Sequence, residues 1–415
     1  MTESAHWRRD TALSLLLLAL IAGTAWWTRI WVITAVPVGF LFGFLLQKGD
    51  LCGASAFSEV VLMRDWRKIF GLWVAIVVSM VGFAVIAGLG WVHLAPKPML
   101  WLNYAVGGAL FGVGTVLAGG CISGCLFKAG AGNLNSMAAL TGIPLGIGLV
   151  EYGPLNAVHR SMMTHVVTSV TGGPVTLSSL TALPYWVIAV GLAVATAAGV
   201  LLRRRAKRPS PAHDALAHRA QRLLTGSWRP WQAGLAIGLL AVPAYLSSAA
   251  SGRNYPLGVT HGVLQAYELL TDNQIVHVWR PAPVTARPAS PPVASPAPKP
   301  VPSAPPKPIN WWLVSVVVSM VPGAWVAARL SGVARLAPRD PAETVTAFFG
   351  GILVGAGAAF ATGCVVGNIL SGWALLSVGM FLFGVVTILA NWITTYVYLM
   401  GGTFDRATVR AVFFR

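Results

Sequence analysis

Three short stretches of this sequence place cysteine beside glycine inside apolar segments. They read QKGDLCGASAF, LAGGCISGCLF and FATGCVVGNIL, and they present Cys52, Cys121, Cys125 and Cys364. A neutral thiol is a weak hydrogen-bond donor and a weak, polarizable acceptor. Conduction needs several sites that bind an ion firmly enough to admit it and weakly enough to release it. A row of thiols therefore suits the passage of a soft anion such as thiosulfate.

Other chemistries are open to the same thiols. A buried free cysteine packs well as a small hydrophobe. The C-x-x-x-C spacing of Cys121 and Cys125 differs from the C-x-x-C of redox pairs, and no histidine or second pair follows at zinc-ligand spacing. A membrane sulfur-transferase or thiol oxidoreductase using these two cysteines stays as the alternative to transport. The sequence predicts no metal and no cofactor.

No motif predicts an enzyme of another kind. The chain has no G-x-x-x-x-G-K-[ST], G-x-S-x-G or H-E-x-x-H. Its few acidic residues, 12 in all, form no evident relay within the apolar segments. We therefore interpret the chain as a non-enzyme.

The glycines around the cysteines predict breaks in the helices. Glycine releases the backbone from helical geometry, and irregular backbone at membrane depth survives only when it is buried in protein or lines a cavity. Helix N-termini that follow such breaks would add a partial positive charge. The glycines expected to support the path are Gly120, Gly124, Gly363 and Gly367.

Polar residues near the breaks form a second candidate group. Lys48, Arg253 and His261 are expected to draw anions toward an entrance, and each is equally typical of an interfacial anchor. In the stretch FATGCVVGNIL, Asn368 stands where LAGGCISGCLF has Cys125. Two further glycine pairs, spaced G-x-x-x-G, predict close packing between helices. They are Gly108 with Gly112 and Gly351 with Gly355.

The elements that must position these residues are membrane helices. Of the 415 residues, 56% are hydrophobic and only 10% are charged, with a mean hydropathy of +0.70. Crossing a bilayer takes roughly 20 apolar residues. This composition predicts an all-α polytopic membrane protein, with the run at 137–150 dipping in rather than spanning. Candidate spans lie near 12–35, 69–92, 104–119, 182–202, 231–250, 311–330, 345–362 and 373–400.

The net charge of +17 does not indicate a nucleic-acid partner. The basic residues collect beside apolar runs, notably at 201–222. Such loops are retained on the cytoplasmic side of a membrane. A second polar segment, 280–308, is rich in Pro, Ala and Ser and is typical of an extended linker. A scaffold that docks partners through these two loops is a further hypothesis.

An internal repeat organises the chain. Residues 106–126 align without a gap on 349–369, so that Cys121 falls on Cys364, and a weaker echo relates 47–57 to 252–263. Duplicated halves with broken helices are typical of transporters, with the substrate site where the halves meet. The repeat does not say whether the halves are parallel or inverted. The predicted division is 1–202, a basic linker at 203–230, a second repeat at 231–279 and 309–415, and the flexible loop 280–308.

Three longer stretches resemble the YeeE/YedE family of bacterial inner-membrane permeases for sulfur compounds. They read GFLLQKGDLCGASAF, LAGGCISGCLFKAGAGNLNS and ATGCVVGNILSGWALLSVGM. The resemblance implies a multi-pass inner-membrane protein with two pseudo-symmetric halves, re-entrant helices and an hourglass shape. It also implies uptake of thiosulfate, or of a selenium compound as in some relatives.

The resemblance further assigns roles to individual residues. It implies that Cys52, Cys121 and Cys364 pass the ion along a central path by S–H hydrogen bonds, with Cys125 additional. It implies a small cytoplasmic TusA-like sulfur-carrier protein as a partner, although none is fused to this chain. The 280–308 insertion departs from compact members of the family.

Overall fold

The computed structural model describes residues 3–28, 30–169, 172–205, 225–271, 309–336 and 340–401. This part of the chain is helical and contains no strand. The Pro-rich loop 280–308 and most of the predicted basic linker 203–230 lie outside the described residues. The predicted division of the chain into domains therefore stays a prediction.

In the described ranges, ten long helices build the frame. They are α1 (Glu3–Thr28), α2 (Ala35–Gly49), α4 (Arg67–Gly88), α5 (Trp101–Leu117), α7 (Leu134–Glu151), α10 (Tyr185–Arg205), α12 (Pro230–Ala250), α14 (Trp311–Leu330), α15 (Pro341–Phe360) and α17 (Val378–Thr394). Shorter elements join them: η1 (Trp31–Thr34), α3 (Gly53–Met63), α6 (Ile122–Gly130), α8 (Asn156–Met163), α9 (Leu177–Thr181), α13 (Thr260–Thr271), η2 (Val365–Ser371), α16 (Gly372–Ala374) and η3 (Thr395–Leu399).

Nine helical segments of the described chain are long and apolar enough to cross a membrane. This confirms the predicted all-α polytopic class. Two predicted boundaries are wrong. The run at 12–35 is not one helix, because α1 ends at Thr28 and a single turn precedes α2. The run at 137–150 is part of α7, whose 18 residues are long enough to span.

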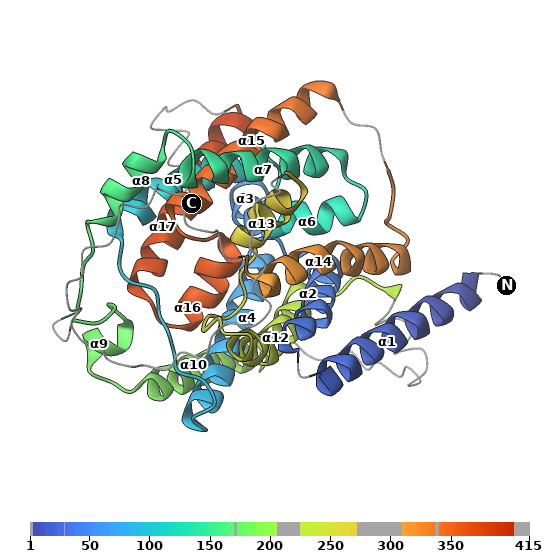
Figure 1. Cartoon of the computed structure of the whole chain (residues 1–415), viewed down its shortest axis with the longest axis horizontal. Coiled ribbons are helices and arrows are strands. Elements are labelled where there is room, and N and C mark those ends of the chain that lie inside the picture. The colour runs from blue at the N-terminus through green and yellow to red at the C-terminus, as the bar shows by residue number, and fades with distance from the viewer. Residues whose placement is uncertain are drawn as a thin grey trace, which may run out of the picture.

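The long helices form two groups with the short helices between them. One group contains α2, α4, α12 and α14, in which α2 packs on α14 and α4 packs on α12. The other contains α5, α7, α15 and α17. In Figure 1, α7 and α15 lie above, and α2, α4, α12 and α14 lie below, the short helices α3, α6 and α13. The cysteine stretches therefore occupy the centre of the molecule.

The two repeats run in opposite directions through this arrangement. A Cβ added to Gly107, near the start of α5, would lie 2.6 Å from the amide nitrogen of Ala361, just after α15. A Cβ added to the equivalent Gly350, in the first half of α15, would collide with the amide nitrogen of Ala118, just after α5. The equivalent helices α5 and α15 thus cross antiparallel at backbone contact, which only small residues permit.

The two G-x-x-x-G pairs pack helices together, as predicted. A Cβ on Gly112 of α5 would lie 2.6 Å from the Thr387 carbonyl oxygen of α17. In the other repeat, a Cβ on Gly355 of α15 would collide with the Ile143 carbonyl of α7. Each repeat therefore contributes one helix to a close pair with the other repeat, and the two halves interlock.

Contacts between the helix ends define two opposite faces. Trp228 N, ahead of α12, donates to Lys48 O at the end of α2, and Lys48 Nζ donates to Ser331 Oγ at the end of α14. We call this the Lys128 face, because Lys128 lies at the end of α6 beside the segment that follows α14. On the opposite face, Asn254 after α12 donates to His93 O after α4. We call it the Lys97 face.

Candidate substrate path

Four short helices begin at the centre of the molecule. The residues immediately before α3, α6 and η2 are Cys52, Cys121 and Cys364, and the residue before α13 is Val259. Each of these four carbonyls accepts the first helical hydrogen bond, at 2.7–3.1 Å, from Ala56, Cys125, Asn368 and Val263 respectively. The cysteines are in extended backbone conformation, as N-cap residues are. Helix N-termini, with their free N–H groups, thus converge where the thiols lie.

The inverted repeat pairs these starts in a definite way. α6 corresponds to η2, so Cys121 matches Cys364, and α3 corresponds to α13, so Cys52 matches Val259. The weak sequence echo between 47–57 and 252–263 falls on this second pair. Three of the four equivalent positions therefore carry a thiol, and the fourth carries a β-branched hydrocarbon.

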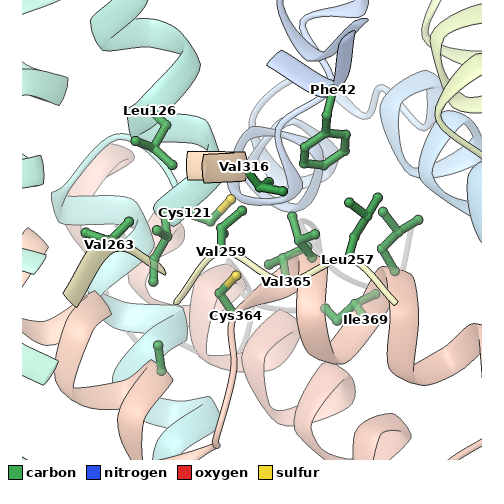
Figure 2. Packing of buried hydrophobic residues seen from close by; sticks show 14 of the residues in the cluster. Phe42, Cys121, Leu126, Leu257, Val259, Val263, Val316, Cys364, Val365 and Ile369 are labelled. Atoms are coloured by element: carbon green, nitrogen blue, oxygen red, sulfur yellow. The ribbon is translucent and has the colours of Figure 1, made fainter. Parts of the chain in front are cut away.

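The thiols lie close to one another. Cys52 Sγ is 3.8 Å from Cys121 Sγ, and Cys121 Sγ is 3.3 Å from Ser123 Oγ. A Cβ added to Gly53 would lie 2.6 Å from Val365 Cγ1, so the starts of α3 and η2 also adjoin. Figure 2 shows Cys121 and Cys364 in one buried cluster, with Val259 between the two sulfurs in this view.

In this conformation apolar side chains close the centre. All four cysteines are free and at most 1% exposed. The surrounding cluster includes Phe42, Val316 and Val365. Val259 also lines a cavity on the Lys97 face, as does Gly363, which precedes Cys364. Passage of an ion would require this apolar packing to open.

Cys125 lies one turn into α6 and not at a helix start. A Cβ added to Gly120 would lie 3.3 Å from Cys125 Sγ, so this thiol packs beneath the turn that precedes Cys121. The sulfur that comes within hydrogen-bonding reach of Cys121 is that of Cys52. The geometry therefore favours Cys52 over Cys125 as the partner of Cys121.

The helix breaks lie one residue before Gly120 and Gly363; Gly119 is itself among the glycines expected to release the backbone, and Thr362 is not. The left-handed backbone is at Gly119, with φ of +66°, and at Thr362, with φ of +54°. These two residues are equivalent in the repeat. A non-glycine residue in this conformation is uncommon, and the Thr362 carbonyl accepts a hydrogen bond from Lys97.

Gly124 and Gly367 are equivalent in sequence and different in surroundings. A Cβ on Gly124 would collide with Cys52 Sγ, so the absence of a side chain lets that thiol lie against α6. A Cβ on Gly367 would meet no atom within 4 Å, and Gly367 instead lines the cavity on the Lys97 face. Gly124 therefore allows close packing in the first half, whereas Gly367 lines the cavity in the second half.

A cavity of about 160 Å³ opens toward the Lys97 face; we call it the Lys97 mouth. Lys97 Nζ donates to the carbonyl and hydroxyl of Thr362 and, at 3.0 Å, to Asn368 Oδ1. Arg253 donates to the Pro256 carbonyl at 2.6 Å. Both cations lie over the ring of Tyr255, at 5.1 Å and 5.4 Å from its centroid.

The Lys97 mouth is cationic and lacks a carboxylate of its own. Among the described residues, neither Lys97 nor Arg253 forms an ion pair; the nearby Glu151 pairs with His261, at 3.1 Å. Burial lowers the pKa of Lys97 to about 7 and the pKa of Arg253 to about 10, because desolvation disfavours their charged forms. An anion in this cavity would supply the missing counter-charge.

One buried hydroxyl beside the Lys97 mouth, that of Thr260, lacks a hydrogen-bond partner among the described residues. Thr260, the first residue of α13, lines the Lys97 mouth and is 3% exposed. A buried polar group without a partner costs free energy, on the order of 1–3 kcal/mol.

A second cavity, of about 280 Å³, opens on the opposite face, and we call it the Lys128 mouth. Lys128 Nζ donates to the Gly119 carbonyl at 2.7 Å, just as Lys97 donates to the equivalent Thr362. Arg335 lines this cavity, as Arg253 lines the other. Unlike the Lys97 mouth, it also contains a carboxylate, that of Asp50, which pairs with Lys68.

The predicted polar residues divide between the mouths and the frame. Arg253 and His261 both line the Lys97 mouth. Lys48 is 2% exposed and donates to Ser331 Oγ at 2.6 Å, so it ties α2 to α14 rather than lining either mouth. Sequence reasoning missed Lys97. The signal was present, because Lys97 stands alone between Pro96 and Pro98 in a connection between two apolar helices.

Asn368 holds the turn before Cys364. Its Nδ2 donates to the carbonyls of Ala361 and Gly363, both at 2.9 Å, and its Oδ1 accepts from Lys97. The side chain is fully buried and every polar atom has a partner. Asn368 therefore fixes both the backbone break and the position of the Lys97 ammonium group.

Comparisons with known proteins agree with this architecture. The family model for sulphur transport matches residues 48–393. The thiosulfate transporter TsuA of Spirochaeta thermophila is 28% identical over 374 residues, covering 88% of this chain and 98% of that protein. TsuA of Escherichia coli is 26% identical over 372 residues, covering 88% of this chain and 94% of that protein.

A shorter match relates the chain to a second group of transporters. The probable transporter YedE of Escherichia coli is 30% identical over 120 residues, which is 28% of this chain and 29% of that protein. The family match spans most of the chain and all four helix starts that converge at the centre. This multi-pass membrane protein belongs to the sulphur transport family, as the resemblance in its cysteine stretches predicts.

Proposed function

We propose that this protein is a permease that takes up thiosulfate, or a closely related sulfur anion, across the bacterial inner membrane. The observation that carries the proposal is the row of thiols at converging helix starts, placed between two cationic mouths. The names of the two full-length relatives, both thiosulfate transporters, support the substrate. In this proposal the chain is not an enzyme, and the thiols bind the ion without reacting with it.

The chemistry of the centre fits weak, stepwise binding. The terminal sulfur of thiosulfate carries negative charge and accepts S–H hydrogen bonds from neutral thiols. The N-termini of α3 and α6 add partial positive charge without a full cation. Cys364 follows Gly363, which lines the Lys97 mouth, whereas no residue adjacent to Cys52 or Cys121 in sequence lines it. An ion entering from this mouth would therefore meet Cys364 first.

Charge distribution supports an orientation. The predicted basic loop 203–222 joins α10 to α12, and α12 begins on the Lys128 face. Basic loops stay in the cytoplasm, so the Lys128 mouth faces inward and the Lys97 mouth faces outward. The outward-facing Lys97 mouth has cations without a carboxylate, which favours capture of the anion from outside. The inner mouth contains Asp50, which shares Lys68 with Glu59, so this mouth carries less net positive charge and favours release of the ion.

Uptake of labelled thiosulfate tests the proposal. In cells that lack other importers, we expect Cys121→Ala and Cys364→Ala each to reduce the initial rate by about tenfold or more, since each removes a resting place on the path. Cys125→Ala is the matched control, and we expect it to keep most of the activity because that thiol packs beneath a turn. Normal uptake in both the Cys121 and Cys364 variants would rule out a thiol path.

The same assay separates the alternatives. Competition by unlabelled selenium oxyanions that exceeds competition by thiosulfate would assign the permease to selenium. A persulfide or disulfide on Cys121, detected by mass spectrometry during turnover, would favour sulfur transfer over passage. A TusA-like carrier at the Lys128 face stays part of the proposal, and co-purification from cells taking up thiosulfate tests it.

A further inference from the structure

The Lys97 ammonium is surrounded by neutral acceptors. Its hydrogen bonds go to Thr362 and to the amide oxygen of Asn368, and its other close contact is the ring of Tyr255. None of these groups carries a negative charge, so only hydrogen bonds and the ring favour the charged form, and a neutral amine with two hydrogens would still keep two of the three bonds. A lysine paired with a carboxylate would instead be locked in its charged form.

The charged and titratable groups around Lys97 do not supply that carboxylate. Arg253, from the segment after α12, is a second cation on the same ring. His261 of α13 is engaged by Glu151 of α7. Cys364, at the start of η2, and Tyr104 of α5, which donates to the Pro98 carbonyl beside Lys97, supply no carboxylate either. The set carries positive charge, which opposes protonation of Lys97 while the mouth is empty.

We propose that the Lys97 mouth binds its anion together with a proton, which is taken up by the side chain of Lys97. This inference rests on the proposed function and adds that a proton binds to Lys97 when the anion binds. The balance is simple. A neutral Lys97 amine, one proton from the outer solution and one dianion give an ammonium group in contact with the anion, with no covalent bond made or broken in thiosulfate.

Electrostatics gives the direction of the linkage. With a pKa near 7, Lys97 in the empty mouth is about 90% neutral at pH 8 and mostly charged at pH 6. A bound dianion favours the charged form, so binding at pH 8 draws in nearly one proton and binding at pH 6 draws in few. The affinity for the anion therefore falls as the pH rises above 7, by up to about tenfold per pH unit.

Calorimetry on the full chain measures this proton directly. Sodium thiosulfate is titrated into purified protein at pH 8 in two buffers that differ in ionisation enthalpy, and the difference in heat gives the protons taken up per anion. We expect nearly one proton at pH 8 and a clearly smaller number at pH 6. Lys97→Arg should bind without proton uptake and with little dependence on pH, because arginine stays charged throughout.

Two further variants locate the proton. Lys97→Met should bind at least tenfold more weakly, with no proton uptake. His261→Gln, which removes the other titratable base of the mouth, should keep the proton uptake of the wild type. Uptake that persists in Lys97→Arg and disappears in His261→Gln would overturn the assignment to Lys97.

The result also separates this inference from the proposed function. Thiosulfate binding by the wild type with no proton uptake at pH 8 would overturn the inference and leave the permease proposal standing. Absence of thiosulfate binding and of thiosulfate uptake at every pH would overturn both.

Discussion

At the scale of single residues, the site combines weak and strong ligands in separate places. The thiols of Cys52, Cys121 and Cys364 lie at the centre, where the proposed path requires that an ion is not held firmly. Full cations are confined to the mouths, where Lys97 and Lys128 each donate to the carbonyl of a left-handed residue. This separation lets charge attract a dianion to the entrance without trapping it at the centre.

Asn368 offers a sharp test of the charge at the outer mouth. Asn368→Asp is nearly isosteric and places a carboxylate where Oδ1 now lies 3.0 Å from Lys97 Nζ. The new ion pair would compete with the substrate, so we expect the KM for thiosulfate uptake to rise about tenfold or more, with a smaller change in maximal rate. Initial-rate measurements over a range of thiosulfate concentrations check this.

The control for the Asp variant is Asn368→Ala, because Asn368 also donates to the carbonyls of Ala361 and Gly363. The Asp variant loses the donors to Ala361 and Gly363, which costs about 2 kcal/mol of stability. Asn368→Ala loses the same donors and adds no charge. A KM in the Asp variant no higher than in the Ala variant would contradict the ion-pair argument.

At the scale of elements, the starting points of the short helices place the cysteines at the centre of the molecule. α3 and α6 start with their first N–H groups toward the centre, and their first turns touch through Gly124, which lies against Cys52 Sγ. The contact depends on a missing side chain. The residue before each helix is extended, so its side chain lies at the meeting point of the helices.

Gly124→Ala should disturb this meeting point without unfolding the frame. The added methyl would displace the thiol of Cys52, so we expect thiosulfate uptake to fall at least tenfold, at a stability cost of about 1–3 kcal/mol from overpacking. Gly148→Ala in α7 is the matched control, since a Cβ there meets no atom within 4 Å. Uptake and thermal unfolding of the two variants, measured side by side, check this; equal uptake would contradict it.

At the scale of the whole molecule, the inverted repeat gives each face an equivalent mouth. Antiparallel packing of α5 on α15 places one cysteine stretch under each face. The mouths share a lysine and an arginine and differ in Asp50, which lines only the Lys128 mouth of the two. Inverted symmetry supplies two similar openings, and in the proposed permease the departures from symmetry distinguish entry from exit.

The same symmetry bears on the Pro-rich loop. α3 and α4 are joined by the three residues 64–66, whereas the equivalent α13 and α14 are joined by 272–310, and Gln265 Oε1 of α13 already accepts a hydrogen bond from Asn310 N. We therefore expect deletion of 281–305 to leave thiosulfate uptake within about twofold of wild type, since loop length has little effect on stability. Loss of uptake with normal membrane abundance would instead support a docking role for the loop.

The sequence by itself determined the class of protein and the repeat, and it predicted the substrate path at Cys52, Cys121 and Cys364. Hydrophobic runs, glycine spacing and motifs are local properties, so they can be read along the chain. Only the tertiary structure decided that the repeats are inverted, that Cys121 meets Cys52 rather than Cys125, and that Lys97 joins Arg253 in one mouth. Those relations join residues far apart in sequence, and packing between helices, rather than any local pattern, brings them together.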